Sequence, residues 1–163
     1  MSRTKQSARK SAKLPKKKLT PNVVCAYNGE MKDGKRDGQG IMNYPDGGEY
    51  KGEWKNGGKH GFGKRTTYNA RKQCEVYEGF FTENKRNGHG TCTFFNGDIY
   101  TGEWQNGRLG GGQGKYTYAD DGTIYDGIWE VGKRRGVGVV TDCSGNVTQG
   151  RWKNRRIVDQ QTL

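Results

Sequence analysis

The chain has 163 residues, the size of one ordinary domain with or without tails. Only 29% of the residues are hydrophobic and 28 are glycine, which excludes a deep aliphatic core, whereas 11% aromatic residues exclude a simple disordered chain. The net charge of +12 favours acidic partners, and the longest apolar stretch, residues 23–27, is far too short for a membrane span or signal peptide. We therefore expect a nuclear or cytoplasmic protein that is not secreted and has no transmembrane segment.

The first segment, residues 1–22, is a basic arm with eight Lys or Arg and no acidic residue. Eight like charges with few apolar residues cannot offset the entropy lost on ordering, so this arm is expected to be disordered. By charge alone it could bind nucleic acid or anionic lipid in a salt-dependent manner. One interpretation is therefore a generic polybasic arm.

The order of residues in the arm favours a more specific interpretation. Removal of Met1 would expose Ser-Arg-Thr-Lys-Gln-Ser-Ala-Arg-Lys-Ser, which resembles the amino-terminal tail of the third core histone at eight of ten positions. The resemblance implies that Lys5 and Lys10 correspond to methylatable lysines, Ser11 to a phosphorylatable serine and Lys13 to an acetylatable lysine. Ser2 replaces an alanine and adds a hydroxyl where reader pockets are tight. The residues expected to be modified or to contact readers are Ser2, Arg3, Thr4, Lys5, Gln6, Arg9, Lys10, Ser11 and Lys13.

Residues 23–154 contain an internal repeat. Most blocks open with Tyr-x-Gly-x-Trp and continue through a turn. The second half of each block then contains Gly-x-Gly followed by further aromatic or apolar residues. Self-similarity at a fixed period of 20 to 50 residues is typical of repeat architectures. The five full blocks begin at Tyr27, Tyr50, Tyr77, Tyr100 and Tyr125, and a partial sixth begins at Thr148.

Alternation within the blocks predicts β-structure. Over Tyr50–Lys55 the apolar residues and glycine fall on one face and the charged residues on the other, as in a half-buried strand. Asn56-Gly57 favours a tight turn, after which the Gly-x-Gly half returns, so each block is expected to be one antiparallel hairpin. We expect Gly52, Gly61 and Gly63 to clear space for an aromatic ring from the neighbouring strand.

Stacking these hairpins predicts an all-β fold, an elongated open antiparallel sheet, with residues 155–163 as a C-terminal tail. The repeat pattern resembles the membrane occupation and recognition nexus (MORN) repeat over residues 27 to about 154. This resemblance implies that the protein acts as a scaffold, as an oligomerisation module or as an attachment to the cytoskeleton or a membrane. In some lysine methyltransferases such repeats precede a SET domain, for which these residues leave no room. The expected aromatic face consists of Tyr27, Tyr50, Trp54, Tyr77, Phe81, Tyr100, Trp104, Tyr125, Trp129 and Trp152.

Two irregularities interrupt the repeat. An insertion at residues 68–76 adds Arg71 and Lys72 to one loop, and the run Gly110-Gly111-Gly112 shifts the pattern of the fourth block by one residue. Both are candidate recognition loops, with a tolerated surface insertion as the alternative.

The sequence offers no catalytic or metal site. His60 and His89 both fall in the segment that runs from the turn through the Gly-x-Gly, where a surface role is expected, and Asp120-Asp121 lies in a predicted turn. Residues 110–114 lack the Lys-Ser/Thr of a phosphate-binding loop. We therefore expect no enzyme activity, no metal and no cofactor. The cysteines lie far apart without a Cys-x-x-Cys pair and are expected to be reduced thiols: Cys25, Cys74, Cys92 and Cys143.

Two functional hypotheses follow from the uneven charge. The middle, residues 23–150, has 17 Lys or Arg against 16 Asp or Glu, whereas residues 151–163 have four against one. The first hypothesis is a non-enzymatic scaffold whose arm mimics a histone tail and engages chromatin readers or modifiers. The alternative is a peripheral membrane or cytoskeletal scaffold whose basic ends bind anionic lipid, nucleic acid or other acidic surfaces. Either could form homo-oligomers through the open sheet edges.

Overall fold

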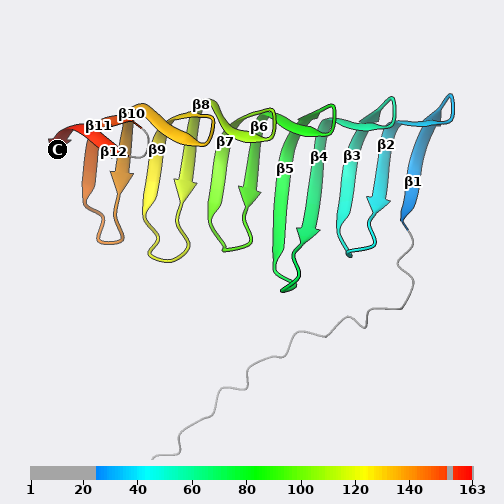
Figure 1. The fold of residues 1–163 in the computed structure, drawn as a ribbon, viewed down its shortest axis with the longest axis horizontal. Helices are drawn as coiled ribbons and strands as arrows, with labels where there is room; N and C mark the ends of the chain where they lie inside the picture. Colours follow the sequence, from blue (N-terminus) through cyan, green and yellow to red (C-terminus); the bar gives the residue numbers. More distant parts are fainter. Residues whose placement is uncertain (1–24, 154–155, 163) are drawn as a thin grey trace, which may run out of the picture.

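A computed structural model describes residues 25–153 and 156–162 and shows a single antiparallel sheet of twelve strands. The strands follow one another in the sheet in the same order as in the chain, so that each hairpin pairs with the next (Figure 1). The predicted all-β, open sheet of stacked hairpins is confirmed. The strands are β1 (Ala26–Lys32), β2 (Lys35–Asn43), β3 (Glu49–Lys55), β4 (Gly58–Tyr68), β5 (Cys74–Thr82), β6 (Lys85–Thr93), β7 (Ile99–Gln105), β8 (Arg108–Thr117), β9 (Ile124–Glu130), β10 (Lys133–Thr141), β11 (Val147–Lys153) and β12 (Arg156–Thr162).

The turns follow the local chemistry of the sequence. Asn56 and Gly57 have φ angles of 50° and 85°, which these residue types tolerate better than others, and they join β3 to β4. The turn between β2 and β3 is closed by hydrogen bonds between the backbones of Tyr44 and Gly48 and of Gly47 and Tyr44, each 2.9 Å long. Turn residues thus set the repeating hairpin.

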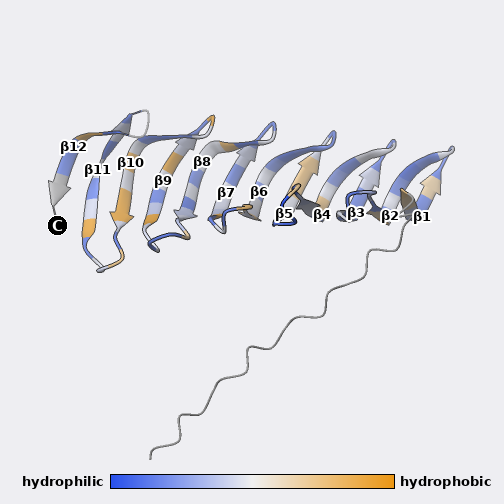
Figure 2. Cartoon of the chain, turned by 60° about the horizontal axis from the view of Figure 1, so that its bottom comes forward, coloured by the Kyte–Doolittle hydropathy of each residue, from blue (hydrophilic) through white to orange (hydrophobic). Residues whose placement is uncertain are grey.

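One face of the sheet carries the buried side chains. In β3 the burial alternates along the strand, with Tyr50 and Trp54 at 0% and 4% exposure. The largest fully buried side chains are four tyrosines and Cys92. Figure 2 shows only short hydrophobic stretches, separated by hydrophilic ones, which agrees with a core of Tyr and Trp rather than aliphatic residues.

The glycines have different roles. A Cβ added to Gly63 would overlap the ring of Tyr50, so Gly63 makes the predicted room for an aromatic ring of the neighbouring strand. A Cβ on Gly52 would first meet the backbone of Gly63 and Phe62, so Gly52 instead allows the two strands to approach closely. The expectation for Gly61 is wrong. A Cβ there would meet the Glu53 carboxylate, and Gly61 has a φ of 55° at an irregularity in the β3–β4 pairing, so Gly61 is required for this bulge rather than for a ring.

The C-terminal tail expected over residues 155–163 contains strand β12, which pairs antiparallel with β11. Ile157 of β12 is paired with Trp152 of β11. The two strands form a hairpin like the earlier ones, so the sheet extends beyond the partial repeat. Within the described ranges no helix is long and apolar enough to cross a bilayer.

Candidate functional site

The expected aromatic face forms one continuous ladder of rings along the sheet. Neighbouring rings meet edge to face, with centroids 5.0–5.5 Å apart and interplanar angles of 80–90°. This geometry suits aromatic pairs and links every hairpin to the next. In order of contact the ladder runs Tyr27, Trp54, Tyr50, Phe81, Tyr77, Trp104, Tyr100, Trp129, Tyr125 and Trp152.

The polar atoms of the ladder are mostly used internally. The Tyr50 hydroxyl donates to the Glu53 carbonyl at 2.9 Å, and the equivalent tyrosines do the same three residues ahead. The Trp54 Nε1 donates to the Gly40 carbonyl of the preceding repeat at 3.2 Å. Burial raises the pKa of Tyr50 and raises that of Tyr125 to about 12. The ladder is therefore a structural core, with neutral tyrosines and little free hydrogen-bonding capacity.

A column of cations lies over this ladder. In each of four repeats, a Lys or Arg contacts a ring of its own repeat and a ring of the next, and it is paired across its hairpin with Met31, Trp54, Phe81 or Trp129. Arg36, for example, has its guanidinium carbon 5.9 Å from the Tyr27 centroid and 4.3 Å from the Trp54 centroid. The column residues are Arg36, Lys59, Arg86 and Arg134.

The fourth repeat interrupts the column. Leu109 pairs with Trp104 at the position that the cations occupy elsewhere. It is half-buried and packs against the core cluster, but it carries no charge to place over Tyr100 and Trp129. The column therefore has a gap between Arg86 and Arg134.

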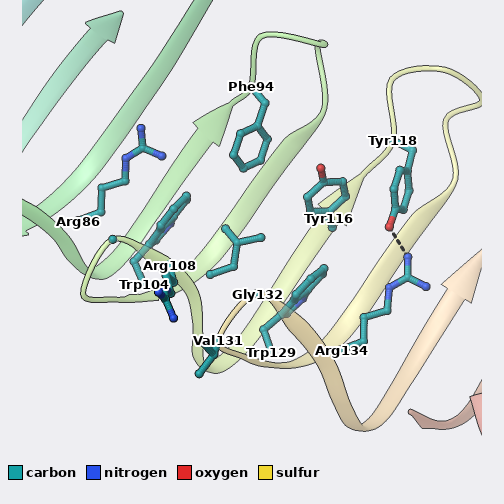
Figure 3. Close-up of a pocket in the computed structure, with 12 residues that line it drawn as sticks. Arg86, Phe94, Trp104, Arg108, Tyr116, Tyr118, Trp129, Val131, Gly132 and Arg134 are labelled. Atoms are coloured by element: carbon teal, nitrogen blue, oxygen red, sulfur yellow. Dashed lines mark hydrogen bonds between the residues drawn. The ribbon is translucent and has the colours of Figure 1, made fainter. Parts of the chain in front are cut away.

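A groove of about 700 Å³ lies at this gap. Aromatic and aliphatic side chains form its floor, and Arg86 and Arg134 lie at opposite ends of it (Figure 3). Arg108 and Val131 line it from the tips of the fourth and fifth hairpins. The floor residues are Phe94, Trp104, Leu109, Tyr116 and Trp129.

Hydrogen bonds fix part of the groove floor. The Tyr116 hydroxyl donates to Asp98 Oδ2 at 2.6 Å, and the Ala119 backbone N–H donates to Asp98 Oδ1 at 2.9 Å. Burial alone would raise the pKa of Asp98, but the hydrogen bonds from Tyr116, Ala119 and Asn96 together hold it below its usual value. The Tyr116 ring also stacks on Phe94 with centroids 5.9 Å apart. The aromatic floor is thus pre-organised.

The other candidates from the sequence are not brought together. His60 lies in β4 and His89 in β6, in different hairpins, and no group of three metal-ligating side chains occurs in the described part of the chain. The cysteines are free: Cys92 is buried, and Cys25, Cys74 and Cys143 are exposed. The histone-like residues, from Ser2 to Lys13, lie outside the described residues.

The two irregular loops differ in their relation to the groove. In the insertion, Asn69 accepts hydrogen bonds from the backbones of Arg71 and Gln73 through its side chain, which closes a turn away from the groove-lining residues. The Gly110–Gly112 run directly follows Leu109, and it lengthens the irregular segment between the paired residues Leu109 and Gly114 by one residue relative to the second repeat. The fourth-block shift thus lies beside the gap.

The groove was not expected from the sequence. Aligning the five full blocks at the second residue after the turn would have found Leu109, because the other four blocks carry Lys or Arg at this position. No such sequence signal predicts that Phe94 and Tyr116 form part of the groove floor, because the equivalent positions of the other repeats carry several residue types. Only the sheet register places them beside Trp104 and Trp129.

Comparison with known proteins agrees with the repeat geometry. The MORN repeat matches residues 27–49, 50–69, 77–99, 100–123 and 125–147, more than half of the chain, and each segment begins at one of the block-opening tyrosines. No curated protein matches the chain significantly. MORN repeats are generally non-enzymatic interaction modules. With its tyrosine-opened hairpins and aromatic ladder, the chain belongs to the MORN repeat family.

Proposed function

We propose that this protein is an interaction scaffold whose repeat sheet carries a basic arm that is read as a histone tail by chromatin readers or modifiers. The observation that carries this proposal is the residue order of the arm, where Ser2–Ser11 matches the histone tail at eight of ten positions. A charge requirement alone would be met by lysines in any order. The preserved order favours recognition of individual side chains.

Features of the sheet support a carrier rather than an enzyme. The ladder residues are packed against one another, and their polar atoms are largely hydrogen bonded within the sheet. Catalysis requires a base held beside a nucleophile or metal, and His60 and His89 are in separate hairpins. An extended sheet of six hairpins is well suited to present an arm at one end, since β1 is the first strand (Figure 1).

The arm would be recognised through its lysines. Readers of extended basic tails pair with the peptide backbone and enclose methylated lysines by cation–π contact. Lys5 and Lys10 are the residues that this mechanism would use, and Arg3 and Gln6 would fix the register. Recognition would therefore depend on the identity of these residues as well as on their charge.

The test compares full-length chains on a panel of histone-tail reader domains and histone lysine methyltransferases. Three forms are needed: the natural chain, a chain with residues 2–19 scrambled at constant composition, and Lys5→Arg/Lys10→Arg, which keeps the charge but removes the methylatable amines. We expect binding or methylation by some panel members only with the natural arm. Equal binding and methylation of all three forms would contradict residue-specific reading.

The concentration of positive charge at the chain ends supports the competing proposal of a membrane-bound or cytoskeletal scaffold. Sedimentation with anionic vesicles over a salt series tests it. Binding that is lost at high salt and is identical for the natural and scrambled arms would favour this alternative, because counterion release depends on charge and not on order. Homo-oligomers through the edge strands β1 and β12 would appear in the same samples as a concentration-dependent mass by light scattering.

A further inference from the structure

The groove at the gap in the cation column combines apolar surface with unpaired positive charge. Elsewhere along the ladder a cation covers the junction between two repeats, as Arg36 does over Tyr27 and Trp54. At the junction of the fourth and fifth repeats Leu109 replaces it, and the space of about 700 Å³ is open. The rings at this junction therefore lack the cation that covers the rings at the other junctions.

The charge of the groove lining is entirely positive. Arginines are the charged residues among the twelve that line the groove, and no acidic residue is among them. Arg86 is paired with Glu75, whereas Arg108 and Arg134 form no ion pair with any described residue. Arg134 instead donates to the Tyr118 hydroxyl (Figure 3). Two guanidinium groups that have no carboxylate partner among the described residues thus lie beside an apolar floor.

Val131, at the rim of the groove, is an independent sign of an apolar contact. It is 52% exposed and has a φ of 47°, a left-handed conformation that β-branched residues disfavour. The equivalent turn residues Asp33, Asn56, Glu83 and Asn106 have φ angles of 49°, 50°, 50° and 50°. Asp and Asn accept this conformation most readily, and none of the four is β-branched as Val131 is. Unfavourable backbone conformations of this kind are found preferentially at functional sites.

We propose that this groove binds an acidic segment of a partner protein, with a large apolar side chain seated over Leu109 and against Val131, and carboxylates paired with Arg108 and Arg134. Arginine forms bidentate hydrogen bonds with carboxylates, and apolar side chains anchored in a pocket supply most of the affinity at protein interfaces. Arg108 is the first residue of β8 and Arg134 the second residue of β10. These strands are two strand spacings or about 10 Å apart, which an extended peptide spans in about three residues.

A protein segment fits the groove better than the other anionic candidates. Single-stranded nucleic acid binds by stacking bases on exposed ring faces, but Trp104 and Trp129 are only 4% and 5% exposed. The groove also presents the aliphatic groups of Leu109 and Val131, which suit an apolar side chain. The basic arm of the same chain is excluded as the occupant by charge, since its eight cations would face three arginines.

The site goes beyond the proposed reading of the arm and shares no residue with it. Its test uses the full-length chain as bait for a phage-displayed library of random peptides, followed by fluorescence anisotropy with the selected peptides. Repeating the selection with the scrambled-arm chain separates the two proposals. If the scrambled-arm chain still binds the selected peptides, the binding belongs to the groove, whether or not chromatin proteins read the arm.

Two variants place in the groove a residue that other repeats carry at the same position, so the fold should accept them. Leu109→Arg restores the cation column and fills the gap, and Val131→Asn removes the apolar rim while relieving the unfavourable backbone. We expect each to weaken binding of the selected peptides by about tenfold or more, as for loss of a central anchor. Leu109→Arg is informative because it adds a charge that attracts acidic ligands yet blocks the apolar seat.

Charge variants complete the test. Arg108→Glu should weaken binding several-fold and reduce its salt dependence, whereas Lys51→Glu, the same change on an exposed residue of β3, should have no effect. Selected peptides are expected to contain acidic residues flanking a large apolar residue. The proposal is overturned if no sequence is enriched, if the enriched peptides are basic, if Leu109→Arg binds them as well as the natural chain, or if oligonucleotides or anionic vesicles displace them through the same residues.

Discussion

Substitution of Gly90 by alanine tests whether glycine in the second strand of each hairpin is needed to seat the tyrosine ring. A Cβ at Gly90 would lie 2.6 Å from Cζ of Tyr77, whereas carbon atoms in ordinary contact are about 3.5–4.0 Å apart. The ring would have to move by about 1 Å. It is fully buried and held between Phe81 and Trp104, whose centroids are 5.0 and 5.2 Å away.

The cost follows from these contacts. Overpacking of a filled core costs about 1–3 kcal/mol, and each displaced edge-to-face contact about 0.5–1.5 kcal/mol. Gly90 is not in the left-handed region, so alanine adds no backbone strain and recovers about 0.5–1 kcal/mol that glycine loses in a strand. We expect Gly90→Ala to lower the free energy of unfolding by about 2–4 kcal/mol.

Urea unfolding of the full-length chain, followed by tryptophan fluorescence and circular dichroism, measures this change. Gly112→Ala is the matched control, because its Cβ would lie 3.3 Å from Cγ of the mobile Glu103 side chain and its backbone is not left-handed either. The control should stay within about 0.5 kcal/mol of the natural chain. If Gly90→Ala unfolded at the same urea concentration as Gly112→Ala, the argument that the tyrosine ring requires glycine would fail.

Two further predictions concern titratable groups of the core. Burial raises the pKa of the core tyrosines, to about 12 for Tyr125, so the unfolded chain releases its tyrosine protons at lower pH than the folded chain does. These groups therefore leave the stability unchanged below pH 10.0, and the stability falls as the pH rises toward 12. Urea midpoints that stay constant over this range while tyrosinate absorbance appears would contradict this prediction. Burial also raises the pKa of the Cys92 thiol to about 12. Iodoacetamide should therefore alkylate the exposed Cys25, Cys74 and Cys143 in the native protein, and Cys92 only after unfolding, as measured by mass spectrometry of the alkylated peptides. Alkylation of Cys92 at the same rate as the other three cysteines would contradict this prediction.

The hairpins and their stacking could be predicted because the signals are local and repeated. Alternation along Tyr50–Lys55 indicates a strand with one buried face, and Asn56-Gly57 indicates the turn that follows. Each is confirmed by the strand and turn geometry of β3 and β4. The same reasoning gave a wrong role to Gly61, because a bulge depends on the pairing of two strands and not on the alternation within one.

The sequence by itself therefore determined the all-β repeat sheet, its period and the residues on its buried face, because alternation and turn chemistry act within a few residues of the chain. Only the tertiary structure decided which side chains of neighbouring repeats meet. Register and bulges bring Arg36 over Trp54, anchor Tyr116 on Asp98, and leave Leu109 facing an open groove between Arg86 and Arg134. These contacts join residues of different hairpins across several strands, and their geometry depends on how the hairpins stack in the sheet.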